Sequence, residues 1–297
     1  MLRPEKSQSK RGVEDEQRPE LAPGLYVTAT PIGNARDITL RALEILRGCD
    51  AILAEDTRVT SKLLAIYGIS KPLSPYNDHN AARERPKVLA RLREGLRLAL
   101  VSDAGTPLVS DPGFKLVREA LGENLPVHAA PGASAPLVAL ALAGLPTDRF
   151  LFAGFLPPKQ GERRTVLEEL KSVRSTLVFF ESAQRLAESL ADMAAVLGSR
   201  MAGVGRELTK LHEEMRRGDL ASLAAHYAKE GPPRGEVTVV VGPPLERQPD
   251  MAQADMLLEK ALVFMPVRAA SDLVAAALDL PRRELYARAL ALKTEHD

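Results

Sequence analysis

Residues 97–113, RLALVSDAGTPLVSDPG, combine a short apolar run with a polar, glycine-containing turn, as a ligand-binding loop requires. Leu98 to Val101 fit a buried strand. Asp103 follows at the predicted carboxyl end of that strand, where ligands bind in open α/β sheets, and its carboxylate can accept hydrogen bonds from ribose hydroxyls or a ligand amine. Gly105 lets the backbone approach a ligand closely. A plain strand–turn–helix corner would contain the same residue types, so both interpretations stay open at this segment.

Other predicted strands also end in polar or glycine-rich turns. These turns are residues 30–34, 55–58, 131–134 and 180–182. Together they could line one crevice between two domains, which is a preferred place for a cofactor. The chain has no P-loop lysine, no Gly-x-Ser-x-Gly elbow and no metal-binding spacing. A cofactor that needs no phosphate-binding loop therefore fits better than ATP.

Length and composition indicate a globular protein of about two domains. The chain has 297 residues, 45% of them hydrophobic and 27% charged. Its net charge of +1 indicates no global attraction to nucleic acid, although a local basic patch is compatible with it. The single cysteine, Cys49, excludes an internal disulfide framework and a Cys-rich zinc site. Because we find no signal peptide and no membrane-spanning apolar run, we expect a cytoplasmic protein without membrane contact.

Strand-like and helical segments alternate from Gly24 to Gly242. This alternation predicts an α/β fold with a largely parallel sheet in the first half, and the dense strands of the second half are compatible with hairpins and a mixed sheet. We expect a disordered tail at 1–23, an N-terminal α/β domain at 24–146, a C-terminal α/β domain at 147–244 and a helical appendage at 251–297.

Some helix boundaries can be predicted from capping residues. Asp37 is predicted to cap a helix over 38–47, and Asp111 to cap a helix with Pro112 at its first position. Three helices are predicted in the appendage, at 252–264, 267–278 and 281–292. Residues 280–286 resemble the second half of a helix-turn-helix, and a plain helical cap explains them equally well.

Six segments together resemble the tetrapyrrole-methylase superfamily. They are TPIGNARDITLRALEIL (30–46), AEDTR (54–58), VSDAGTPLVSDPG (101–113), PGASA (131–135), GLPTDRFLFAGFLP (144–157) and RELTKLHEE (206–214). Within the superfamily they are most similar to the bacterial family of ribosomal RNA small-subunit methyltransferases I. The resemblance runs from about Gly24 to Gly242, and the helical tail resembles that family's C-terminal appendage.

The resemblance implies a two-domain α/β fold with a cofactor cleft between the domains and a small helical appendage. It implies a homodimer that binds S-adenosylmethionine and methylates the ribose 2′-oxygen of a cytidine in the decoding region of 16S rRNA, on the small ribosomal subunit. Carried onto this chain, the cofactor-binding positions are Pro31, Asp103, Ala104, Gly105, Ser134, Ala135, Phe180, Leu208 and Val237.

The chemistry of this transfer suggests catalytic candidates. A sulfonium methyl donor is already activated, so alignment of the reacting atoms is the main requirement, and no metal is needed. A ribose hydroxyl is a poor acid, so a nearby proton acceptor or cation should help. The candidates are Asp56, Arg58 and Glu181, each of which could instead be a structural ion pair or a strand-end cap. Candidate phosphate contacts are Arg163, Arg164, Lys210, Arg216 and Arg217.

Two other functions are compatible with the sequence. The first is a methylase of the same fold that acts on a porphyrinoid or another small molecule. The second is a non-catalytic nucleotide-binding or helix-turn-helix regulatory module. Basic residues around the rim of the cleft would favour RNA over a macrocycle.

Overall fold

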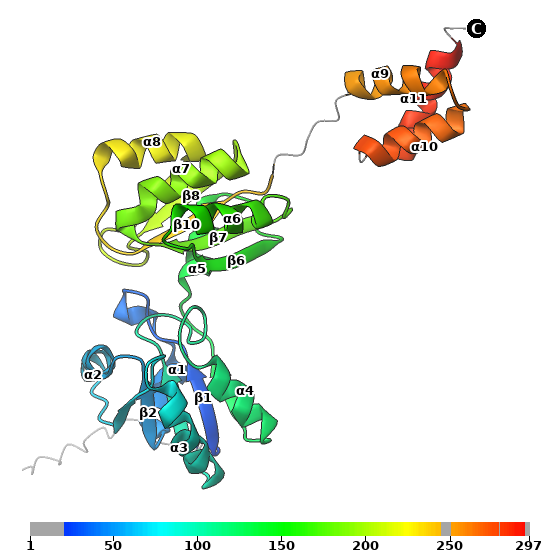
Figure 1. Cartoon of the computed structure of the whole chain (residues 1–297). Coiled ribbons are helices and arrows are strands. Elements are labelled where there is room, and N and C mark those ends of the chain that lie inside the picture. The colour runs from blue at the N-terminus through cyan, green and yellow to red at the C-terminus, as the bar shows by residue number, and fades with distance from the viewer. Residues whose placement is uncertain (1–20, 245–250, 279, 295–297) are drawn as a thin grey trace, which may run out of the picture. The chain divides into compact units, whose positions relative to one another are not determined.

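The computed structural model describes residues 21–244, 251–278 and 280–294. The chain divides into two compact units, Met1–Pro244 and Leu245–Asp297 (Figure 1). The first unit contains two five-stranded sheets, and the second is helical. The tail predicted to be disordered spans residues 1–23, and residues 1–20 of it lie outside the described ranges.

The first sheet is parallel throughout, in the order β3-β2-β4-β1-β5, as predicted for the first half of the chain. Its strands are β1 (Gly24–Thr28), β2 (Ala51–Ala54), β3 (Leu73–Pro75), β4 (Arg97–Val101) and β5 (Val127–Ala130). The helical segments between them are η1 (Ala35–Asp37), α1 (Leu40–Gly48), α2 (Thr57–Ile66), α3 (Ala81–Arg93) and α4 (Phe114–Gly122).

Helices cover both faces of this sheet. Successive strand residues point to opposite faces, so Leu25 packs with Leu89 of α3, and the next residue, Tyr26, packs with Leu46 of α1. Burial on both sides explains why β2 and β4 are almost wholly apolar instead of alternating in polarity.

The second sheet is mixed, in the order β6-β7-β10-β8-β9, with only β6 and β7 parallel. Its strands are β6 (Phe150–Phe155), β7 (Thr176–Glu181), β8 (Met201–Arg206), β9 (Glu214–Asp219) and β10 (Val237–Val241). The accompanying helical segments are α6 (Gln160–Leu170), η2 (Ala183–Arg185), α7 (Leu186–Leu197) and α8 (Leu220–Glu230). Helices α6, α7 and α8 share one hydrophobic cluster with the sheet.

Helix α5 (Ala135–Ala143) covers the other face of the second sheet. Its Ala139 and Leu140 pack against Val178 of β7 and Val240 of β10. The predicted domain boundary at residues 146 and 147 places this helix with the first sheet, whereas its buried side chains belong to the core of the second. The chain thus passes from one sheet to the other before α5, directly after β5.

The structure differs from the sequence-based expectations at three elements. Helix α1 begins at Leu40 with Thr39 as its cap, because residues 35–37 form the 3-10 turn η1 instead of leading into the helix. Helix α4 begins at Phe114, so Asp111 is not its cap. Strand β9 was not predicted, because its sequence EMRRGD shows no apolar alternation.

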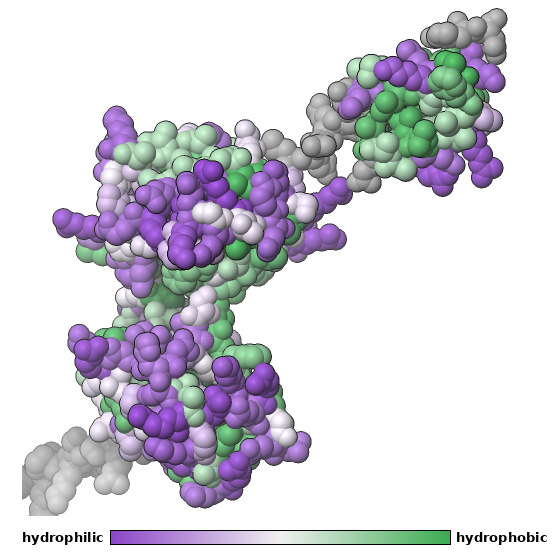
Figure 2. All heavy atoms as spheres, in the orientation of Figure 1, coloured by the Kyte–Doolittle hydropathy of each residue, from purple (hydrophilic) through white to green (hydrophobic). Residues whose placement is uncertain are grey.

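The second unit contains α9 (Met251–Leu262), α10 (Val267–Leu278) and α11 (Arg282–Thr294), close to the predicted helices. They enclose a small core that includes Leu258, Val274 and Leu285. Figure 2 shows apolar side chains on the visible face of this unit. The exposed apolar residues of the unit include Phe264, which is 84% exposed. No helix in the described parts of the chain is long and apolar enough to cross a membrane.

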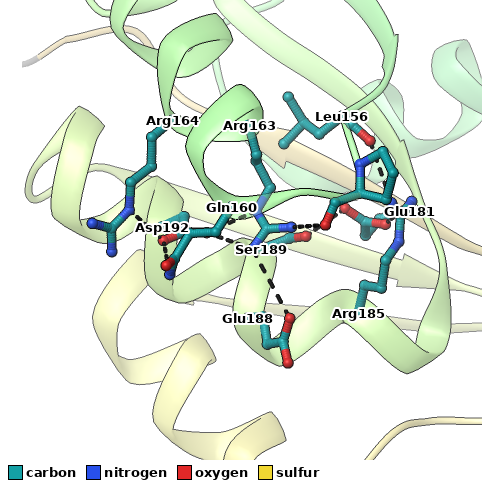
Figure 3. A network of polar contacts seen from close by, with 10 residues as sticks. Leu156, Gln160, Arg163, Arg164, Glu181, Arg185, Glu188, Ser189 and Asp192 are labelled. Carbon is teal, nitrogen blue, oxygen red and sulfur yellow. Dashed lines mark hydrogen bonds and ion pairs between the residues drawn. The ribbon is translucent and has the colours of Figure 1, made fainter.

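A buried ion-pair network joins α6 to α7 (Figure 3). The side chains of Arg163 and Asp192 are each 1% exposed, and their charged atoms lie 2.6 Å apart. Arg164 and Gln160 donate further hydrogen bonds to the same carboxylate. The sequence-based suggestion that Arg163 contacts phosphate is therefore wrong: its guanidinium is buried and holds two helices together, and removing one partner of such a pair is strongly destabilising.

Candidate active site

A cavity of about 530 Å³ is lined by the turns that follow the carboxyl ends of β1, β4 and β5, and by residues of the second sheet. Ile32 comes from the first of these turns, Asp103 from the second and Ser134 from the third. The second sheet contributes the end of β7 and the start of β10. The volume is typical of a small-molecule site, and the position agrees with the rule that ligands bind outside the carboxyl ends of parallel strands.

Eight of the nine positions predicted to bind the cofactor line this cavity. They are Asp103, Ala104, Gly105, Ser134, Ala135, Phe180, Leu208 and Val237. The ninth, Pro31, lines a smaller adjoining groove of about 280 Å³ beside helix α2, which we call the α2 groove. Cavity and groove share the side chains or backbone of Ile32, Asp103, Ala104 and Glu236, so they are contiguous.

The strand order creates the site. The chain leaves β1, forms β2 and β3 on one side, returns to place β4 beside β1, and adds β5 on the other side. The turns after β1 and β4 therefore lie next to each other at a topological switch point. Thr30 and Gly105 exchange two backbone hydrogen bonds there, of 2.8 and 3.1 Å, and the Thr30 hydroxyl donates to the Ser102 carbonyl.

The loop from Ser102 to Gly113 has an unusual backbone. Gly105 has φ +82°, and Leu108 and Ser110 have φ of 71° and 67°, which non-glycine residues rarely adopt. Such conformations cluster at ligand sites because the surrounding structure has to enforce them. Here the left-handed Ser110 turns the chain so that Asp111 lines the cavity instead of capping α4.

Three carboxylates form an acidic wall of the cavity: Glu55, Asp103 and Asp111. Burial is the largest influence on each and raises all three pKa values. The pKa of Asp111 reaches about 6, because burial and the neighbouring carboxylates outweigh a hydrogen bond with Ser102. Close like charges are costly without a cation, so this wall favours a positively charged ligand.

Asp56 and Arg58, two of the predicted catalytic residues, line neither the cavity nor the α2 groove. They pair with each other, with Arg58 Nε 3.0 Å from Asp56 Oδ1, and the Arg58 side chain is 86% exposed. Hydrogen bonds from Arg58 lower the pKa of Asp56 to about 2. Asp56 also caps α2, and its backbone N–H donates to Asp103. Asp56 is therefore better suited to capping α2 and positioning Asp103 than to accepting a proton.

Glu181, the third predicted catalytic residue, is at the cavity edge but its carboxylate is fully engaged (Figure 3). It accepts hydrogen bonds from Ser182 N–H at 2.7 Å and from the Ser189 hydroxyl at 2.5 Å, and it forms an ion pair with Arg185 at 2.7 Å. With a side chain that is 0% exposed, it has little capacity left for a substrate proton. Its catalytic role stays a prediction.

The candidate phosphate contacts all have protein partners. Lys210 pairs with Glu207 and Glu236, Arg216 pairs with Glu214, and Arg164 pairs with Asp192. Arg217 donates to the carbonyls at the end of α5. Among the described residues, the cavity lining contains no lysine or arginine, so the wall of the cavity itself is not basic.

Glu55 and Asp111 are the cavity residues of greatest chemical interest that are absent from the predicted binding and catalytic positions. Glu55 lies in the turn 55–58, which the sequence analysis places at the crevice without giving Glu55 a role. Asp111 was assigned a capping role because it precedes a proline, and only the backbone of Ser110 explains its actual direction. No group of three or more potential metal ligands occurs in the described part of the chain.

Comparison with known proteins identifies the family. Residues 24–224 match the family model of the tetrapyrrole (corrin/porphyrin) methylases. Residues 248–293 match a second model, described as the RsmI C-terminal HTH domain, where HTH stands for helix-turn-helix. A ribosomal RNA small subunit methyltransferase I of Erythrobacter litoralis is 54% identical over 94% of this chain and 99% of its own length. The protein of the same name from Mesorhizobium japonicum is 52% identical over 92% of this chain and 93% of its own.

Solved structures agree with the fold. A uroporphyrin-III C-methyltransferase from Thermus thermophilus, solved with S-adenosylhomocysteine, has a TM-score of 0.52 and 19% identity, and the match covers 74% of this chain and 97% of that one. Together with the sequence matches, this confirms the predicted fold class. Membership of this methylase family, shown by the sequence matches, supports the predicted cofactor S-adenosylmethionine. The chain therefore belongs to the tetrapyrrole (corrin/porphyrin) methylase family, among the small-subunit ribosomal RNA methyltransferases I.

Proposed function

We propose that this rRNA methyltransferase transfers a methyl group from S-adenosylmethionine to the ribose 2′-oxygen of a cytidine in the decoding region of 16S rRNA. The names of its close relatives support an rRNA substrate. The observation that carries the chemistry is the acidic cavity at the strand switch point, with Asp103 and Gly105 on one turn. A porphyrinoid substrate is disfavoured because the relatives with more than half of their residues identical are named as rRNA enzymes.

The residues of the cavity fit S-adenosylmethionine. Bound there, this cofactor supplies a methyl group that its positive sulfonium already activates. We assign the apolar side chains of Phe180 and Val237 to the adenine, and the turn at Gly105 to close backbone contact. Asp103 and Glu55 are assigned to the hydroxyl and cationic groups, since carboxylates accept hydrogen bonds from ribose and favour positive charge.

The acceptor needs alignment and a route for its proton. The ribose oxygen forms the new C–O bond while the C–S bond breaks and sulfur keeps the electron pair. The hydroxyl proton then passes to a carboxylate or to water. Holding the reacting atoms in line supplies most of the acceleration, and a well-placed base adds about 10²–10⁴-fold.

Asp111 is our candidate for the carboxylate that accepts that proton. It lines the cavity, and its pKa of about 6 lies near a physiological operating pH. By contrast, Arg58 stabilises the charged form of Asp56, and the carboxylate of Glu181 already has three partners. We therefore assign the base to Asp111 and give Asp56 and Glu181 positioning roles.

The remaining assignments concern assembly. We propose that the helical unit docks the enzyme on the small ribosomal subunit: α11 exposes Arg283, Tyr286 and Lys293, whereas Arg282 is paired with Asp272. We also propose a homodimer that works in the cytoplasm, where small subunits are found. Exposed apolar side chains of the first unit, such as Phe114 and Phe155, could take part in the dimer contact.

The function is tested by mapping ribose methylation. Small subunits from cells that lack the protein should carry one unmethylated cytidine in the decoding region, and purified protein with S-adenosylmethionine should restore the methyl group. Primer extension at low nucleotide concentration, or mass spectrometry of the digested RNA, reads the site. Methylation on a base instead of a ribose, or none at all, would contradict the proposed reaction.

Replacing Gly105 with valine should weaken cofactor binding. A Cβ at this position would lie 3.3 Å from Ile32 Cγ2, and φ +82° is unfavourable for an L-residue, above all a β-branched one. We expect Gly105→Val to weaken binding by at least about tenfold from a micromolar-range affinity, which is roughly −8 kcal/mol, as measured by calorimetry.

Gly95 provides a matched control for backbone strain. It has φ +85° but open space around its Cβ position, and it lies before the amino end of β4, whereas Gly105 follows the carboxyl end. Gly95→Val should lower the thermal stability to a similar extent and leave cofactor affinity unchanged. Equal affinities for both variants and the wild type would count against our placement of the cofactor.

Asp111→Asn should slow the methyl transfer and change its pH dependence. A carboxyl of pKa about 6 is a competent base only above that pH, so the wild-type single-turnover rate should fall as the pH drops through about 6, or somewhat lower once a cationic cofactor is bound. The variant should lose about 10²–10⁴-fold, lack this acidic limb, and recover partly at high pH. If Asp56→Asn or Glu181→Gln shows this behaviour instead, the base is that residue.

Deletion of residues 245–297 should leave cofactor affinity unchanged and weaken methylation of the small subunit mainly through KM. The cavity draws its lining from the first unit alone, so the deletion removes none of its residues. Sedimentation should give a dimer mass for both forms, and a monomeric full chain would contradict the homodimer. Loss of cofactor binding in a deletion variant that remains folded would place the helical unit in the cofactor site.

A further inference from the structure

We propose that the α2 groove binds the target nucleotide, with its base against helix α2 and its ribose turned toward the cofactor cavity. This inference rests on the proposed RNA substrate and adds the place where that substrate is held. The groove has about 280 Å³ of space, lined on one side by α2 and on the other by the turn that starts at Pro31.

Contiguity with the cofactor cavity is the first support. Asp103 and Ala104 line both spaces, so a ligand in the groove lies directly beside a cofactor in the cavity. An acceptor oxygen has to reach the methyl carbon, and a neighbouring subsite with a shared wall allows that.

The chemistry of the lining fits a nucleobase. Val59, Leu63 and Ile66 form an apolar stripe along α2, and Val59 and Ile66 are 39% and 64% exposed. Thr60 lies within this stripe and is 2% exposed, and its hydroxyl has no hydrogen-bond partner among the described residues. A buried hydroxyl without a partner is costly, and the edge of a base can both donate to it and accept from it. Enzymes that act on single nucleotides use this combination of apolar contact and edge recognition.

Exposed basic residues flank the groove. Arg36 follows the lining residue Ala35, and Arg58 and Lys62 each precede a lining residue of α2. Lys210 lines the groove directly, but Lys210 and Arg58 are already paired with carboxylates of the chain. Arg36 and Lys62 are the cations that can meet the phosphates on either side of one inserted nucleotide, because phosphate contacts position a nucleic acid while base contacts specify it.

Two substitutions on α2 test the groove. Val59→Trp fills it with an indole, and Thr60→Val removes the hydroxyl while keeping the shape of the side chain. Ser61→Trp is the matched control for the first, because Ser61 is an exposed residue of the same helix that does not line the groove. All three leave the cofactor cavity intact, because Val59, Thr60 and Ser61 lie outside its lining.

The readouts are cofactor affinity by calorimetry and single-turnover methylation of unmethylated small subunits over a range of subunit concentrations. We expect unchanged cofactor affinity for all three variants. Thr60→Val should lower kcat/KM about five- to tenfold, because it removes one neutral hydrogen bond to the substrate. Val59→Trp should lower it about 100-fold or more, because the indole displaces the acceptor ribose from its reactive position. Ser61→Trp should stay within about twofold of the wild type.

The outcomes separate this inference from the proposed function. If the wild type methylates the decoding-region ribose and both groove variants do so at the wild-type rate, the groove does not hold the substrate and the inference is overturned. If the wild type does not methylate small-subunit rRNA, the proposed function and the inference both fail. Loss of cofactor affinity in Thr60→Val would assign the groove to the cofactor instead of the RNA.

Discussion

The two backbone hydrogen bonds between Thr30 and Gly105 hold together the turns after β1 and β4, and the site depends on this contact. It forms only because β4 is inserted beside β1 in the strand order. It requires a left-handed Gly105, because only a residue without a Cβ takes that conformation freely. Once the turns are joined, Asp103 is directed into the cavity and Ser102 is buried beneath it. A change in strand order would separate these groups entirely.

Electrostatics then make the site ready for its ligand. Glu55, Asp103 and Asp111 line one cavity, and burial together with neighbouring carboxylates raises their pKa values. A cationic cofactor relieves that repulsion, so its binding should stabilise the fold and release Asp111 to ionise. The same arrangement keeps anionic phosphates out of the cavity and leaves them to the basic residues that flank the α2 groove.

Sequence patterns predicted the parallel sheet and most of the cofactor cavity because both depend on local order: apolar runs followed by polar turns. The resemblance of several such turns to one family supplied the cofactor-binding positions, and eight of nine line the cavity. The errors arose where distant contacts decide the outcome. Asp111 faces the cavity because of the backbone at Ser110, and Arg163 is buried because Asp192 on another helix meets it. The local sequence pattern shows neither the backbone conformation of Ser110 nor the contact between Arg163 and Asp192.

Strand β9 has a consequence for how the protein behaves in a crowded solution. It forms one edge of the second sheet, where unpaired backbone groups could pair with a strand of any other chain. Its sequence EMRRGD places Arg216 and Arg217 exposed on that edge, and a foreign strand would have to bury these charges to add there. The lack of apolar alternation that hid β9 from sequence analysis is thus the property that protects the monomeric sheet against strand-by-strand aggregation.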